Sequence, residues 1–158
     1  MTTVNGLPAH VLLVHFIVVL VPLTALLAVL CAVWPAARQR LIWLTVALAL
    51  FTAVLTPLTA NAGEWLEHRV DGSTVLHTHT ELGDTMVYFS SALFVAVALL
   101  AFSYLRQSRT GSTNRIVTGL VVTLVVLVSV AANVQIYRIG DSGAQATWAG
   151  GTEAGSEK

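Results

Sequence analysis

Long apolar runs separated by short polar segments set the pattern of this chain. The runs cover residues 11–34, 41–62, 85–105 and 116–137. Each run has about 21–24 residues, within the ~17–25 residues with which a helix crosses a bilayer core. Only helices satisfy their backbone hydrogen bonds within such segments in lipid, so all four runs are predicted to be helical.

Short connections between these runs make neighbouring helices antiparallel. The predicted fold is therefore all-α, a four-helix antiparallel transmembrane bundle over residues 1–148. The segment 149–158 is rich in small and polar residues and is predicted to be a flexible C-terminal tail. Near the end of the fourth run, Gly140 followed by DSG is typical of a helix stop.

Composition supports a membrane protein whose first partner is the lipid bilayer. Of 158 residues, 56% are hydrophobic and 10% are charged, and the mean hydropathy is +0.78. Soluble domains carry about 25% charged residues. The net charge is zero, which argues against a nucleic-acid partner, because such a partner requires a basic surface. Cys31 is the only cysteine, so no internal disulfide can form.

The arginines predict the orientation of the bundle. Arg38 and Arg40 lie in the first connection, and Arg106, Arg109 and Arg115 lie in the third. No Lys or Arg precedes the first run, and the middle connection contains one arginine. The positive-inside rule therefore places the first and third connections in the cytoplasm. In a plasma membrane, both termini and the middle connection then face outward.

Polar residues gather at this outward end, including all five histidines: His10, His15, His68, His77 and His79. His10 and His15 are about 140° apart around a helix at ~100° per residue, so they cannot share a face. His15 lies deeper in the membrane and is predicted to face the bundle interior. The alternative is a neutral His15 that hydrogen-bonds to a neighbouring helix.

The segment HTHTELGD, residues 77–84, leaves the start of the third helix open. A capping-box pattern favours a start near His79. The alternative is a start at Ser73 or Thr74. That alternative aligns three side chains in one stripe: His77, Glu81 and Asp84. His77 and His79 point to opposite sides of a helix, so only one of them can face inward.

Several motifs resemble those of a known family. They are NGLPAHVLLVHF, LVPLTAL, GEWLEHRV, HTELGD and RIGDSGAQATW. Their order and spacing, from about Leu7 to Trp148, resemble an uncharacterised family of small four-helix bacterial membrane proteins, a domain-of-unknown-function family common in actinobacteria. The resemblance implies four transmembrane helices and no assigned activity. Family members often have histidine where this chain has Asp141, and aspartate is a poor haem ligand but can bind a metal.

The leading functional hypothesis is a cofactor site at the outward end. One version is a b-type haem with His15 and either His77 or His79 as axial ligands. A second version is a transition-metal site, because imidazole suits zinc, copper and iron. Its ligands would come from this set: His10, His15, His77, Glu81 and Asp141. Because the inner half has no histidine, a second haem with histidine ligands cannot lie there.

Two other hypotheses remain. The protein could be a cofactor-free structural or accessory subunit that packs against other membrane subunits. It could also be a proton-linked carrier or pH sensor, since histidine titrates between about pH 5 and 8. An enzyme is disfavoured, because Ser90 and Ser91 have no base at suitable spacing and no HExxH motif occurs.

Overall fold

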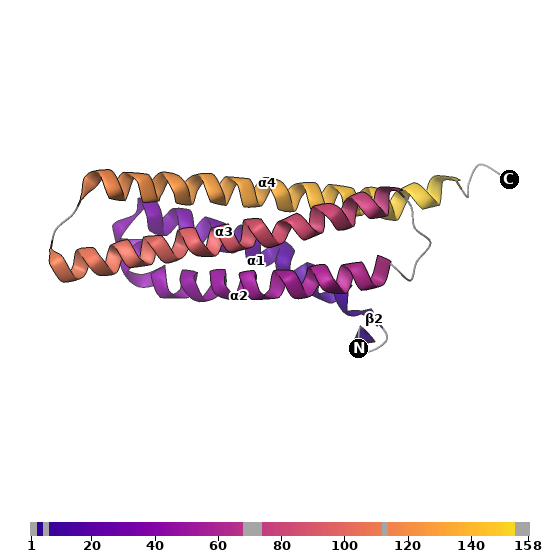
Figure 1. The fold of residues 1–158 in the computed structure, drawn as a ribbon, viewed down its shortest axis with the longest axis horizontal. Coiled ribbons are helices and arrows are strands. Elements are labelled where there is room, and N and C mark those ends of the chain that lie inside the picture. Colours follow the sequence, from indigo (N-terminus) through magenta and orange to yellow (C-terminus); the bar gives the residue numbers. More distant parts are fainter. Residues whose placement is uncertain (1–2, 5–6, 68–73, 112–113, 154–158) are drawn as a thin grey trace.

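In the part of the chain that the computed structural model describes, four long helices form an antiparallel bundle (Figure 1). The structure describes residues 3–4, 7–67, 74–111 and 114–153. The helices are α1 (Ala9–Val33), α2 (Pro35–Glu67), α3 (Thr74–Thr110) and α4 (Arg115–Glu153). Before α1, strands β1 (Thr3–Val4) and β2 (Leu7–Pro8) pair antiparallel, with Thr3 opposite Pro8 and Val4 opposite Leu7. His68 lies outside the described residues.

Each helix contains a segment long and apolar enough to cross a membrane. These segments are Leu12–Val33, Pro35–Trp65, His77–Thr110 and Arg115–Gln145. Large apolar side chains such as Phe16, Leu26 and Leu120 are exposed on the outside of the bundle. Such exposure is expected where the surrounding solvent is hydrocarbon. The predicted all-α class and the four membrane-spanning helices are confirmed.

Local sequence signals explain where the helices end. Gly111 has φ = 64° and donates its backbone N–H to the carbonyl of Gln107 at 3.0 Å, which closes α3 with a left-handed residue. The side-chain oxygen of Asn114 accepts hydrogen bonds from the N–H groups of Ile116 (3.1 Å) and Val117 (3.3 Å), so it caps the start of α4.

The corner between α1 and α2 is closed by a buried arginine. The Nε of Arg38 donates to the carbonyl of Cys31 at 2.7 Å, and its Nη2 donates to the carbonyl of Ala32. These carbonyls belong to the last turn of α1, where helical partners are missing. Arg38 is only 9% exposed, so its stem is packed and its charge meets the negative end of the helix dipole.

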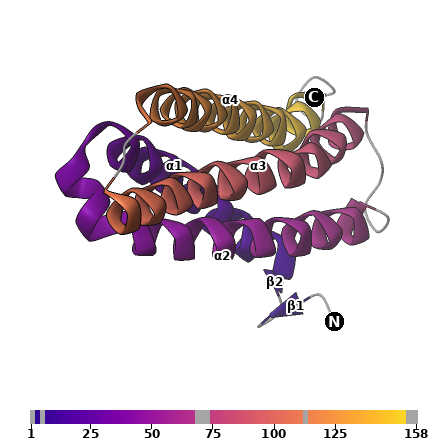
Figure 2. The ribbon, with the colours of Figure 1, turned by 60° about the vertical axis from the view of Figure 1, so that its left-hand side comes forward.

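The helices pack in cyclic order, so that α1 lies diagonally opposite α3 and α2 lies opposite α4 (Figure 2). We call the end at which α1 begins and α4 ends, which carries His10 and His79, the histidine end, and the end that carries Arg38 the arginine end. A cluster of small and branched buried residues, including Ala28, Ile42 and Leu100, fills the half toward the arginine end.

A smaller buried cluster lies toward the histidine end. Its members are Ile17, Val21, Met86, Ala132 and Ile139. Three of them, Ile17, Met86 and Ile139, also line a cavity. The larger buried cluster therefore lies toward the arginine end, and the cavity lies toward the histidine end.

Two boundaries resolve or correct the sequence-based expectations. Helix α3 begins at Thr74, the earlier of the two predicted starts. Helix α4 continues through Gly140 to Glu153, so the predicted helix stop at Gly140 is wrong. Within this helix, the hydroxyl of Ser142 donates to the carbonyl of Ile139 at 3.0 Å, so its polar group is paired inside the helix. The flexible tail stays a prediction, and residues 154–158 lie outside the described chain.

Candidate functional site

A cavity of about 270 Å³ lies near the histidine end and is lined by all four helices. Its wall is mostly aliphatic or glycine, with side chains such as Val14, Ile17 and Ile136. The polar side chains in the wall are two histidines, three threonines and one aspartate: His10, His79, Thr56, Thr59, Thr80 and Asp84. This volume lies close to the lower end of the ~300–1,000 Å³ typical of small-molecule sites.

His10 enters the cavity from the first turn of α1. Its Nδ1 lies 3.0 Å from the carbonyl oxygen of Thr59 on α2. A carbonyl can only accept, so Nδ1 carries the proton and donates it. In the neutral ring, the lone pair is then on Nε2. The ring lies against Gly63, where an added Cβ would be 2.9 Å from its Cε1 atom.

His79 enters the cavity from α3 and is held in the same way by α4. Its Nδ1 lies 3.0 Å from Oγ of Ser142, and the ring also bonds to the backbone of Ile139. The Ser142 hydroxyl already donates to the Ile139 carbonyl. It must therefore accept from Nδ1–H of His79, which again leaves the lone pair on Nε2. A Cβ at Gly143 would lie 2.9 Å from the ring's Cε1.

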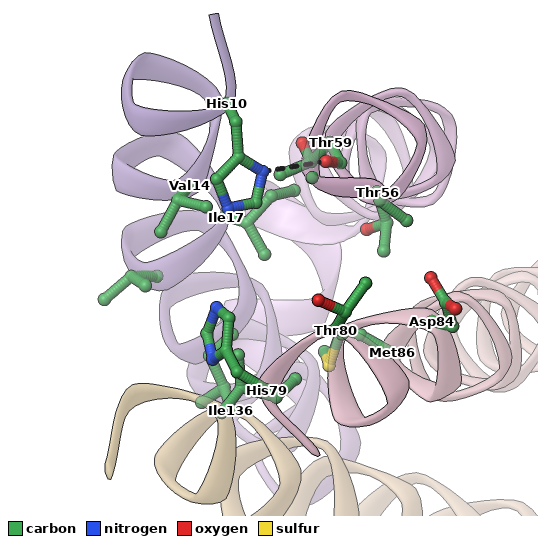
Figure 3. A pocket seen from close by; sticks show the side chains of 15 residues that line it. His10, Val14, Ile17, Thr56, Thr59, His79, Thr80, Asp84, Met86 and Ile136 are labelled. Carbon is green, nitrogen blue, oxygen red and sulfur yellow. Dashed lines mark hydrogen bonds between the residues drawn. The ribbon is translucent and has the colours of Figure 1, made fainter. Parts of the chain in front are cut away.

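The two rings point toward one another across the cavity, with their Nε2 atoms directed inward (Figure 3). Helices α1 and α3, which carry them, are diagonal partners. The ring of His10 bonds to Thr59 through Nδ1, and the ring of His79 bonds to Ser142 through Nδ1, so these two contacts leave Nε2 of each ring unused. The site therefore presents two opposed imidazole lone pairs in an apolar space.

The two supports repeat one design. In each helical hairpin, the histidine of the first helix bonds to a group on the second and packs on a glycine there. Gly63 follows Thr59 by four residues, and Gly143 follows Ile139 by four residues. We call these two supports the histidine cradles: Thr59 with Gly63, and Ile139 and Ser142 with Gly143.

The structure separates the other residues named from the sequence. His15 is exposed and does not line the cavity. His77 is also exposed, and its Nε2 lies 3.4 Å from Oε1 of Glu81 on the surface of α3. Asp141 is exposed and accepts a hydrogen bond from the Gln145 amide at 3.0 Å. Among the residues that the structure describes, no three His, Cys, Asp or Glu side chains gather as metal ligands.

Helix geometry explains the difference at the first pair. His10 and His15 cannot share a face, so the contact of His10 with Thr59 and Gly63 turns His15 outward. The expectation that His15 faces inward does not match this placement. For the second pair, His79 faces inward and His77 outward, which agrees with the expectation that only one of them can do so.

Sequence reasoning missed the histidine cradles. The available signal was a glycine late in the second and fourth helices, where glycine costs about 1 kcal/mol relative to alanine. Gly63 and Gly143 tolerate that cost because each lets an imidazole ring approach the helix backbone. The partners Thr59 and Ser142 carry no signal of their own, because hydroxyl residues are common inside membrane helices.

Comparison with known proteins places the chain in a family. A family model described as "Predicted membrane protein (DUF2231)" matches residues 6–155. No curated protein and no solved structure matches the chain. The match covers nearly the whole sequence and agrees with the resemblance drawn from the motifs. The chain is therefore an integral membrane protein that belongs to the DUF2231 family, a family of unknown function.

Proposed function

We propose that this protein is a membrane cytochrome that binds one b-type haem between His10 and His79. The observation that carries the proposal is the pair of opposed Nε2 lone pairs in one apolar cavity. Histidine is a common axial ligand of haem iron, and helix bundles build cofactor sites from side chains on facing helices. The bound haem would supply one-electron transfer.

The histidine cradles support ligation in a specific way. A histidine that binds a metal usually donates its other ring N–H to a carbonyl or similar acceptor, which fixes its tautomer and orientation. Thr59 provides that acceptor for His10, and Ser142 provides it for His79. A histidine that served only to join helices would need no free lone pair directed into a cavity.

The cavity wall also suits a flat apolar macrocycle. Gly83 and Ala60 add little side-chain volume, and Val14 and Ile136 provide apolar contact. Burial in such a wall is one of the factors that set the reduction potential of a haem. A cofactor-free accessory subunit would leave this cavity without a role, and the transition-metal version lacks a third clustered ligand among the described residues.

The arginines also favour one side of the membrane for the cavity. The arginines of the first and third connections favour the cytoplasm for the arginine end, so the histidine end would face outward across a plasma membrane. Electrons would then be exchanged with other subunits or carriers at the outer face. The sequence places no histidine in the half of the bundle toward the arginine end, so we do not propose a second haem with histidine ligands there.

An optical spectrum of the protein purified from a haem-supplied host tests this function. We expect a Soret band that shifts on reduction with dithionite, with one haem per chain. His10→Ala and His79→Ala should lose most of the haem. His15→Ala and His77→Ala are matched controls from the same helices, and both should keep it, because their side chains lie outside the cavity.

Two results would contradict the proposal. If the wild-type protein is colourless when purified from a host that loads a control cytochrome with haem, the protein does not bind haem. A coloured protein whose spectrum survives both His10→Ala and His79→Ala, but not His15→Ala, would move the site to the sequence-based ligand pair.

A further inference from the structure

A second hollow lies on the bilayer side of the bundle. It is a groove of about 540 Å³ between α1 and α4. Side chains that line it include Pro22 and Leu26 from α1, and Ser129, Val130, Asn133 and Tyr137 from α4. Its wall is mostly apolar and lies within membrane-spanning segments, so its natural occupant is a molecule dissolved in the bilayer.

The groove continues the cavity along one helix seam. On α1 the cavity wall includes Val18, and the groove begins at Pro22, about one helical turn further on. On α4 the cavity wall includes Ile136, and the next residue, Tyr137, lines the groove. The cavity and the groove therefore follow one another along the α1–α4 seam, about one helical turn apart on α1.

Polar groups in the groove wall indicate a ligand that is more than a lipid tail. Ser129 is 2% exposed, and its hydroxyl has no hydrogen-bond partner among the described residues. The amide of Asn133 donates to the carbonyl of Ser129 at 2.8 Å, which leaves its oxygen as an acceptor. Unpaired polar groups inside a membrane are costly and usually serve a ligand or a path. An acyl chain has no group that could pair with them.

We propose that the α1–α4 groove binds a membrane quinol, which donates electrons to the haem; this inference rests on the proposed function. The isoprenoid tail would lie along Leu26 and Val130, and the ring near Asn133 and Tyr137, beside the cavity wall at Ile136. A quinol combines an apolar tail with two ring hydroxyls, so it fits both the apolar wall and the acceptor oxygen of Asn133.

The reaction balances with one-electron acceptors. Oxidation of one quinol to quinone would release two electrons and two protons, and a haem held by His10 and His79 would accept one electron at a time. Both O–H bonds of the quinol would break, the two electrons would leave one at a time, and the two protons would be released to water. With one haem per chain, the two acceptors are the haems of two chains, or one haem that an outer one-electron acceptor reoxidises between steps.

A matched pair of tryptophan substitutions tests the groove. Val130 and Leu127 are both exposed on α4, at 57% and 63%, but only Val130 lines the groove. We expect Val130→Trp to slow reduction of the ferric protein by decylubiquinol by about tenfold or more, equivalent to about 1.4 kcal/mol. Leu127→Trp should reduce at the wild-type rate. Dithionite should reduce all three fully, because it does not need the groove.

The outcomes separate the groove from the haem. The quinol site is wrong if the haem is present but decylubiquinol fails to reduce it. It is also wrong if Val130→Trp and Leu127→Trp are reduced equally fast. In both cases the proposed haem site is unaffected. If no haem binds, the cytochrome fails and the groove is tested through quinone extracted with the purified protein. Quinone in wild type and Leu127→Trp, with little in Val130→Trp, would then support the groove, and equal amounts or none would overturn it.

Discussion

The chemistry of each cavity histidine depends on what its Nδ1 atom contacts. At His10 the contact is a carbonyl, and at His79 it is a hydroxyl whose own proton is already used. Both arrangements place the proton on Nδ1 and the lone pair on Nε2. Two neighbouring glycines make these contacts possible, because each removes a Cβ that would meet the ring.

Gly143 provides a direct test at this scale. In Gly143→Ala the new Cβ would lie 2.9 Å from Cε1 of His79, so the ring must move and the haem-to-protein ratio should fall. Gly140→Ala is the control on the same helix, since nothing lies within 4 Å of its added Cβ. It should keep the haem and gain up to about 1 kcal/mol of helix stability. Equal haem content in the two purified variants would contradict the role of Gly143.

Individual helices show what the sequence could and could not predict. Length and hydropathy placed four spans, because crossing a bilayer requires a helix of known length. The face of α1 that points inward could not be deduced, because α1 is apolar on all sides and His10 and His15 were both available. The start of α3 was open between Thr74 and His79. The turn DGST, residues 71–74, favoured the earlier start, and the capping-box pattern of Thr78 and Glu81 favoured the later one.

The site depended on these undetermined rotations. The candidates named from the sequence included His10 and His79, but the haem pair chosen from them used His15. Once His10 is fixed by its contact with Thr59 on α2, the position of His15 follows from helix geometry. That contact joins residues 49 positions apart, and no local pattern reports it.

The junction of α1 and α2 makes a prediction about stability. Arg38→Met removes two hydrogen bonds from a charged group to the last carbonyls of α1 and should destabilise the protein by about 2–3 kcal/mol. Arg40→Met removes the same charge from the same corner, but Arg40 is exposed, so its effect should be small. Unfolding midpoints in mixed detergent and SDS compare the two variants, and equal midpoints would refute the capping role of Arg38.

The whole bundle is chemically uneven along its axis. Its arginine half is a packed apolar core, and its histidine half holds the cavity. The first helix begins and the last helix ends at the histidine end (Figure 1). The direction of the bundle in the membrane therefore decides which compartment the site serves.

Fusion reporters test that direction. With the arginine end in the cytoplasm, alkaline phosphatase fused after Lys158 should be active, and green fluorescent protein at the same position should be dark. A phosphatase inserted at Gly111, in the connection between α3 and α4, should be inactive. The reverse pattern would place the cavity on the cytoplasmic side and contradict the proposed location.

The confinement of the cavity to one end has a bioenergetic consequence. An electron that enters and leaves at the histidine end crosses no part of the bilayer, and protons released there stay on the same side. Turnover would then move no net charge through the membrane, so it would neither build a voltage nor be slowed by one. Such a protein would exchange electrons between the quinone pool and outer carriers without conserving energy.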